Sequence, residues 1–307
     1  MPRKPKTVSP TADGNRPQLG LVCQTHDERI RFRTITRSAL YALPDAARAP
    51  RLREIFRHNV ERLASAIAFC REQSLRLYRM PSSLFPFSDT PDYAHLLDDL
   101  APVLGQIGTT AKDDGLRLVM HPDQFVVLSS DSASVVENSR TILLQHARLL
   151  DLLQQPQSPW AAINIHGGKA GRLPALVAEI RRLPESVRAR LTLENDELAY
   201  GSDEILQACT QAGVAMVFDA HHHVIYEELD RYDDRSLPRM LAAAARTWPQ
   251  AGWQMTHISN GRAGFSDRAH SDYITTMPPC FRDAPFIEVE AKAKDLAIAQ
   301  LRTTWAA

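Results

Sequence analysis

Eight short apolar runs alternate along the chain with longer segments of helical periodicity, and this alternation constrains the fold more than any other feature. Each run has four to six residues and is rich in strand-forming side chains, as expected for parallel strands buried on both faces. The runs are Gln18–Cys23, Leu75–Arg79, Leu116–Met120, Ala161–Ile165, Leu191–Glu194, Ala215–Asp219, Trp253–His257 and Phe286–Glu290.

The segments between the runs repeat apolar residues at intervals of three and four, which indicates amphipathic helices. The pattern is clearest over residues 51–73 and 132–153, and Ser132 stands where an N-cap is expected. Shorter helices are predicted at Leu173–Leu183, Ser202–Ala212, Ser236–Thr247 and Lys294–Leu301.

Strands that alternate with helices over about 290 residues predict a single (β/α)8 TIM barrel, with its active site at the carboxyl ends of the strands. A doubly wound open sheet is the alternative fold. The GxGxxG turn with which such sheets bind dinucleotides does not follow the first run. The barrel is therefore the preferred prediction.

Composition and charge limit the class of protein to which this barrel can belong. The chain balances 36 Lys+Arg against 36 Asp+Glu, which argues against a uniformly basic nucleic-acid-binding protein. Because no stretch approaches the roughly 20 apolar residues of a membrane helix, we expect a cytoplasmic protein without a membrane partner. Residues 1–16 are basic and proline-rich and lack the apolar segment of a secretory signal, so we expect a disordered tail before one barrel domain over residues 17–307.

Ionisable residues stand at the carboxyl ends of six of the eight predicted strands. Asp, Glu and His make up about one residue in seven of the chain, so chance would place about one of them across eight such ends. Since these ends meet at one rim of a barrel, the six side chains are expected to converge on one site. They are His121, His166, Glu194, Asp219, His257 and Glu290.

Imidazoles mixed with carboxylates suit zinc, manganese or iron, whereas calcium prefers oxygen ligands. Six ligands exceed the three that one catalytic zinc usually takes from a protein. We therefore expect two or more ions that share a bridging carboxylate, and Glu194, in the middle of the series, is best placed to bridge. Ions about 4 Å apart are typical of phosphodiester hydrolysis.

The stretch VFDAHHHV adds three consecutive histidines directly after the sixth run. We expect them to begin the following loop, where His222 or His221 can reach a further ion with His270 as its partner. At least one of His221, His222 and His223 is expected to serve the structure or to orient a ligand instead.

At these residues the sequence resembles the UV damage endonuclease family, whose relatives include apurinic endonuclease IV among the metal-dependent TIM barrels. The matching stretches follow the family order from residue 18 to residue 292. They are LGLVC, RFRTIT, LYRMPSSLFPFS, MHPDQFVVL, INIHGGKAGR, LTLENDE, VFDAHHHV, THISNG, RAHSDYI and IEVEAK.

The resemblance implies a monomeric DNA-repair enzyme with no obligate protein partner. Its substrate would be double-stranded DNA that contains UV lesions, including pyrimidine dimers, 6-4 products and abasic sites. It would nick immediately 5′ to the lesion and leave a 3′-hydroxyl and a 5′-phosphate. Residues 17–307 would form its endonuclease domain.

The resemblance also implies two or three divalent ions, with manganese preferred and zinc, magnesium or cobalt as alternatives. In the grouping that we expect, Glu194 bridges an ion held by His121 and His166 to an ion held by three other ligands, Asp219, His257 and Glu290. The full implied ligand set is His121, His166, Glu194, Asp219, His222, His257, His270 and Glu290.

Three positions depart from the family pattern. Asp89-Thr90-Pro91 stands where some relatives carry His-Pro, and Met255 stands where some carry a lysine. These two differences leave the third ion open. Leu21 replaces a tyrosine, so no lesion contact is assigned to the first strand.

Several residues outside the ligand set are candidates for DNA contact. Gln124 and Phe125 follow His121 closely and are expected to probe the duplex, because a flat ring can replace lost base stacking at a lesion. The alternative is that Phe125 plugs the mouth of the barrel. Arg31 and Arg33 lie in the long first loop, where an extended backbone would place them on one side to meet phosphates; a solvated charged loop is the alternative.

Lys169 follows Gly167 and Gly168, and glycines let a backbone approach closely. Lys169 is therefore a candidate for phosphate contact. Together with Glu194 and His121, it is expected to take part in catalysis.

Two other functions fit parts of this pattern. A sugar isomerase or epimerase could use the same barrel and a similar metal ring, but its small substrate would not require an arginine-rich loop or a Gln-Phe probe. A metal-dependent damage-binding protein would need the probe but no cluster of several ions.

Overall fold

The computed structural model describes residues 16–27 and 29–305. Its strands form a closed barrel in chain order from β1 to β8, with every neighbouring pair parallel and β8 paired to β1. The predicted (β/α)8 barrel is therefore confirmed, and the open-sheet alternative is wrong. Except for Arg16, the tail expected over residues 1–16 lies outside the described residues.

The strands agree closely with the eight apolar runs. The largest differences are at the starts of β2, β4 and β7, which begin two residues later than the runs. The strands are β1 (Gln18–Val22), β2 (Leu77–Met80), β3 (Arg117–Met120), β4 (Ile163–His166), β5 (Leu191–Glu194), β6 (Ala215–Asp219), β7 (Met255–Ile258) and β8 (Phe286–Val289).

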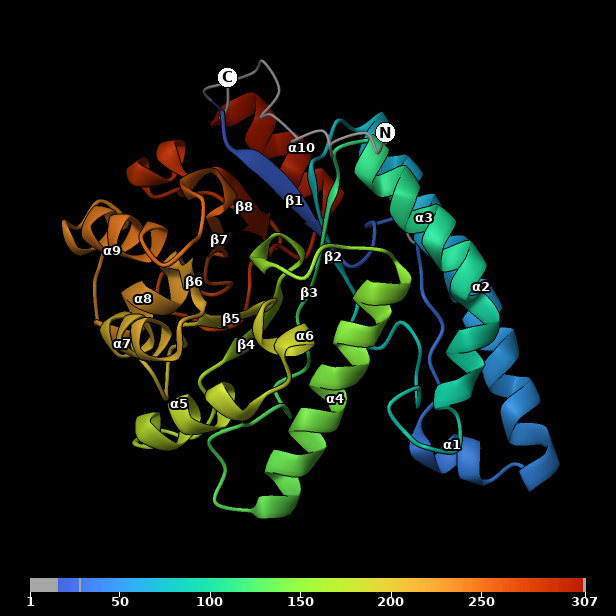
Figure 1. Ribbon diagram of the computed structural model, residues 1–307. Helices are drawn as coiled ribbons and strands as arrows, with labels where there is room; N and C mark the ends of the chain where they lie inside the picture. The colour runs from blue at the N-terminus through green and yellow to red at the C-terminus, as the bar shows by residue number, and fades with distance from the viewer. Residues whose placement is uncertain (1–15, 28, 306–307) are drawn as a thin grey trace, which may run out of the picture.

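Helices surround this barrel, and α2, α3 and α4 lie side by side on one flank (Figure 1). The expected helices are present as α2 (Asp45–Glu72), α4 (Ala133–Leu152), α5 (Leu173–Arg182), α7 (Ser202–Ala212), α9 (Ser236–Ala245) and α10 (Asp295–Thr304). Helices that were not expected are α1 (Arg37–Tyr41), α3 (Ala101–Asp113), α6 (Glu185–Arg188) and α8 (Ala220–Tyr226). Short 3-10 turns complete the connections at η1 (Ala94–Leu100), η2 (Pro159–Ala161), η3 (Ala251–Trp253) and η4 (Pro279–Asp283).

The starts of helices α4 and α8 differ from what the sequence predicted. Ser132 does occupy the N-cap of α4, but its hydroxyl pairs with the hydroxyl of Ser134 rather than with the helix backbone. The three histidines expected in a loop lie in helix α8 instead. The loop expectation was wrong because the carboxylate of Asp219 accepts a hydrogen bond from the backbone N–H of His222 and so starts a helix at once.

The amino-terminal end of the barrel is closed by a buried arginine. The guanidinium of Arg117, which is 0% exposed, donates to the backbone carbonyls of Pro159, Trp160 and Trp253. It also lies 5.3 Å from the ring centroid of Trp248. Each of the three guanidinium nitrogens thus donates to one backbone carbonyl.

Among the described residues, no helix has both the length and the apolar character that crossing a bilayer requires.

Candidate metal centre

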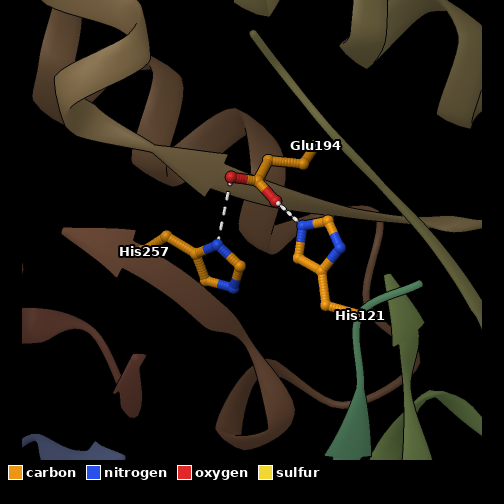
Figure 2. A group of neighbouring side chains, drawn as sticks. All are labelled: His121, Glu194 and His257. Atoms are coloured by element: carbon orange, nitrogen blue, oxygen red, sulfur yellow. Dashed lines mark hydrogen bonds and ion pairs between the residues drawn. The ribbon is translucent and has the colours of Figure 1, made fainter. Parts of the chain in front are cut away.

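Glu194 lies at the centre of the carboxyl-terminal rim of the barrel. Figure 2 shows its carboxylate between the rings of His121 and His257. Its Oε2 is 3.1 Å from Nε2 of His121 and its Oε1 is 3.0 Å from Nδ1 of His257. The side chain of Glu194 is only 1% exposed to solvent, so its charge depends on these neighbours rather than on water.

The other predicted rim residues gather around the same point. Three overlapping groups have ligand atoms within 4.8 Å of one another in the described part of the chain. The groups are His121 with Glu194 and His257, His166 with Glu194 and His222, and Asp219 with His257 and Glu290.

Strand pairing explains this convergence. His166 is paired with Glu194 across β4 and β5, and Asp219 is paired with His257 across β6 and β7. Paired residues of parallel strands project to the same side of a sheet. The pairing therefore aims these side chains into the barrel.

The grouping around Glu194 differs in part from the expected one. His121 shares its group with His257 rather than with His166, and His166 shares its group with His222. The group of Asp219, His257 and Glu290 agrees with expectation. His270 lies at the edge of the cluster, with its Nδ1 3.8 Å from Oε2 of Glu290.

Three buried side-chain atoms of the predicted ligands lack any hydrogen-bond partner. They are Nδ1 of His166, Oδ2 of Asp219 and Nε2 of His257. A buried polar atom without a partner typically costs about 1–3 kcal/mol. A divalent ion would supply the missing partner to Nδ1 of His166 and Oδ2 of Asp219, whereas Nε2 of His257 faces Glu288. The residues present thus fit a metal centre, and the mixture of imidazole and carboxylate favours manganese, zinc or iron.

The charges of the cluster shift its pKa values in opposite directions. Burial alone would raise the pKa of Glu194, but the nearby imidazoles of His257 and His166 hold this pKa well below its usual range. Burial favours the neutral form of His222, yet the carboxylates of Asp219 and Glu194 raise its pKa to about 9. Without an ion, a proton therefore sits on the imidazole of His222 between these carboxylates. Because an ion must displace this proton, the affinity for the ion should fall as the pH falls.

The histidines of helix α8 have separate roles in the structure. His222 belongs to the cluster. His221 contacts the hydroxyl of Tyr232 at 2.7 Å and the backbone carbonyl of Asp267 at 3.0 Å. His223 lies between the hydroxyls of Ser202 and Ser236, at 2.9 Å from each. His221 therefore links α8 to the Asp267 loop, and His223 links α8 to the first residues of α7 and α9.

Four residues next to the cluster were missed by the sequence reasoning. Asn164 donates to Oε2 of Glu194 at 2.5 Å. Glu288 and Arg79 lie one layer deeper in the barrel, and Oε2 of Glu197 is 3.6 Å from Nε2 of His222. The strand alternation could have found Glu288, because it stands two residues before Glu290 and so projects to the same side.

The predicted probe residues are exposed at the same end of the barrel. Gln124 is exposed, and the side chain of Phe125 is 74% exposed, so Phe125 does not fill the barrel mouth. Phe125 borders a hollow of about 180 Å³ together with Phe85 and Phe87. An exposed ring beside an aromatic hollow can stack on a flat ligand.

The loop after β1 that carries Arg31 and Arg33 is held against helix α2. Asn59 accepts from the backbone N–H of Arg33 at 2.8 Å and donates to its carbonyl at 2.8 Å. Arg31 and Arg33 line a hollow of about 310 Å³ with His58 and Arg62. The loop thus gathers cations on one surface.

Lys169 lies outside the three ligand groups. Its ammonium forms an ion pair with Asp131, which also pairs with Arg172. The backbone around Lys169 is held by the hydroxyl of Tyr200, which donates to the Lys169 carbonyl at 2.5 Å.

Comparison with known proteins finds relatives that match nearly the whole chain. A family model described as UV-endonuclease UvdE matches residues 17–306. A UV DNA damage endonuclease from Nostoc sp. is 51% identical over 291 residues, which cover 94% of this chain and 90% of the relative. A UV DNA damage endonuclease from Deinococcus radiodurans is 45% identical over 289 residues, which cover 93% and 95%. Among solved structures, SacUVDE superposes with a TM-score of 0.78 at 25% identity, covering 94% of this chain and 98% of its own.

Proposed function

Because this chain belongs to the UV-endonuclease UvdE family, we propose that it is a DNA-repair endonuclease that nicks duplex DNA immediately 5′ to UV photoproducts. Its substrates would be pyrimidine dimers, 6-4 products and abasic sites, and its products a 3′-hydroxyl and a 5′-phosphate. The observation that carries the proposal is the buried carboxylate of Glu194 between His121 and His257, within a larger ring of ligand atoms. Such a ring is what metal-assisted phosphodiester hydrolysis requires.

Two divalent ions, manganese in the first place, would be held by the three groups, of which two share Glu194 and two share His257. His270, beside Glu290, would assist a third ion. When bound, such ions polarise the phosphodiester and lower the pKa of water.

The ligand residues themselves fix the orientation of the site. Nδ1 of His121 is 3.0 Å from the backbone carbonyl of Pro122, so its proton is held there and Nε2 is left to face Glu194. Asn164 donates to Oε2 of Glu194 and accepts from the hydroxyl of Thr192 at 2.8 Å. These contacts support the assignment of Glu194 and His121 to catalysis, because they hold both groups in one geometry before substrate arrives.

DNA contact is assigned to residues on the rim. Gln124 and Phe125 would enter the gap at a lesion, where the stack is already weakened. Arg31 and Arg33 would bind backbone phosphates. Lys169 would exchange Asp131 for a phosphate of the strand that is cut, which would bring its charge to the reacting group.

Two rival functions make different predictions in one assay. Pure protein is incubated with Mn²⁺ and UV-irradiated supercoiled plasmid, with unirradiated plasmid as the control. The proposed endonuclease converts only the irradiated plasmid to the nicked form. A sugar isomerase or epimerase would leave both plasmids intact, and a damage-binding protein would retard the irradiated plasmid without nicking it.

A further inference from the structure

His257 is enclosed between carboxylates on both edges of its ring. Its Nδ1 faces the rim, 3.0 Å from Oε1 of Glu194 and 3.3 Å from Oε1 of Glu290. Its Nε2 faces the barrel interior and is 2.7 Å from Oε2 of Glu288, an ion-pair contact in which the ring N–H is not aligned as a hydrogen bond. Both His257 and Glu288 are 0% exposed, so water cannot replace either contact.

Glu288 belongs to none of the ligand groups in the described chain. It is paired with His257 across β7 and β8, one layer below the rim. Nη1 of Arg79 lies 3.0 Å from the same Oε2 and also contacts Glu290. Arg79 therefore supplies the counter-charge that lets a carboxylate remain buried at this depth.

We propose that Glu288 is a positioning residue for the metal centre: its carboxylate, 2.7 Å from Nε2 of His257, keeps the ring proton on that nitrogen and so leaves the Nδ1 lone pair for an ion. The inference rests on the proposed metal centre. The two ring nitrogens of a ligating histidine are distinguished by the hydrogen bond that the other nitrogen makes. His121 shows a similar arrangement, because the carbonyl of Pro122 holds the proton on its Nδ1 and leaves its Nε2 free to bind an ion.

The alternative role for Glu288 is to neutralise Arg79 and nothing more. Two substitutions separate the roles. Glu288→Gln removes the charge but keeps an oxygen that can accept the Nε2 proton, whereas Glu288→Met removes both at similar volume. Thr256→Val is the matched control, because Thr256 is a buried polar residue of β7, next to His257, that donates to the carbonyl of Phe286 and not to the cluster.

The first experiment measures Mn²⁺ affinity of the metal-free full chain by titration, with free Mn²⁺ followed by electron paramagnetic resonance. A partner that orients a ligating histidine is typically worth about 10–100-fold in metal affinity. We expect that loss for Glu288→Met, a loss of less than about threefold for Glu288→Gln, and native affinity for Thr256→Val. Equal losses for Glu288→Gln and Glu288→Met would overturn the inference, since charge alone would then matter.

The second experiment needs no substitution and so does not depend on the variants folding. Imidazole ¹⁵N shifts of the native, zinc-loaded chain report which nitrogen of His257 carries a proton. The inference expects a proton on Nε2 and zinc on Nδ1; zinc on Nε2 would overturn it. If the native chain binds neither Mn²⁺ nor Zn²⁺, the proposed metal centre itself is wrong. That result differs from a native chain that binds metal but shows equal losses in the two Glu288 variants or zinc on Nε2 of His257.

Discussion

The carboxylate of Asp219 lies 2.7 Å from the backbone N–H of His222 and caps helix α8 through its Oδ1. Its other oxygen, Oδ2, is buried without a partner. One side chain thus ends a strand, starts the next helix and offers a free ligand atom to the cluster. The cap also places His222 in the first turn of α8, which explains how a histidine from a run of three reaches the site.

This double role predicts different effects for two substitutions. Asp219→Asn keeps a capping oxygen, so the metal-free chain should be at least as stable as the native chain. Asp219→Ala loses the cap and should lower the free energy of unfolding by about 1 kcal/mol. Both should abolish incision. Urea denaturation in EDTA measures the first effect, and equal stability of the two variants would show that the cap contributes nothing.

Damage recognition is tested at Phe125. Phe125→Ala should weaken binding to a dimer-containing duplex by about 1–3 kcal/mol, the cost of a lost base–aromatic stack. Phe125→Tyr keeps the ring and should bind as the native chain does. Binding to undamaged duplex should change little in either variant. The measurement is a titration of both duplexes at fixed salt with an uncleavable substrate, and equal losses on the two duplexes would remove the probe assignment.

Phosphate contact is tested at Arg33. Arg33→Ala should weaken binding to damaged and undamaged duplex alike and should lower the salt dependence of log K by about one phosphate contact. Arg246→Ala is the matched control, because Arg246 is an exposed arginine at the carboxyl end of α9, which leads to the amino-terminal end of β7. A loss confined to damaged duplex would instead place Arg33 at the lesion.

Acid stability is tested at His223. Burial lowers the pKa of His223 to about 4, whereas a histidine in the unfolded chain titrates near 6.5. As the pH falls from about 6.5 to about 4, the unfolded state gains a proton that the folded state resists, so His223 makes the folded chain less stable over this range. In EDTA, the stability of His223→Gln should therefore decline less than that of the native chain over this range. Parallel stability curves for the two proteins would contradict the shift.

The strands and the rim residues could be predicted from sequence because both follow from local pattern. A buried parallel strand is a short apolar run, and the residue that ends it projects to a known rim, as at Glu194 and Asp219. Helix α8 could not be predicted in this way, since seven residues carry too little periodicity and its start depends on the Asp219 cap.

The partners within the centre could not be predicted because they depend on the geometry of the closed barrel. His121 directly follows β3 and His257 lies in β7, which are not neighbouring strands, and only the closed barrel brings both residues to Glu194. Glu288 and Arg79 were missed for a related reason. Strand alternation places Glu288 inside the barrel, but its ion pair with Arg79 joins β8 to β2 and depends on the closed barrel, in which only β1 lies between these two strands.

The central claim is that a metal centre shared at Glu194 nicks DNA beside UV damage. The most direct test uses an end-labelled duplex with one thymine dimer, treated with the native chain in Mn²⁺, the native chain in EDTA, and Glu194→Gln in Mn²⁺. We predict a single nick immediately 5′ to the dimer with a 3′-hydroxyl end, no nick in EDTA, and a rate lower by orders of magnitude for a folded Glu194→Gln. Incision by Glu194→Gln at close to the native rate, or equal cutting of an undamaged duplex, would contradict the account.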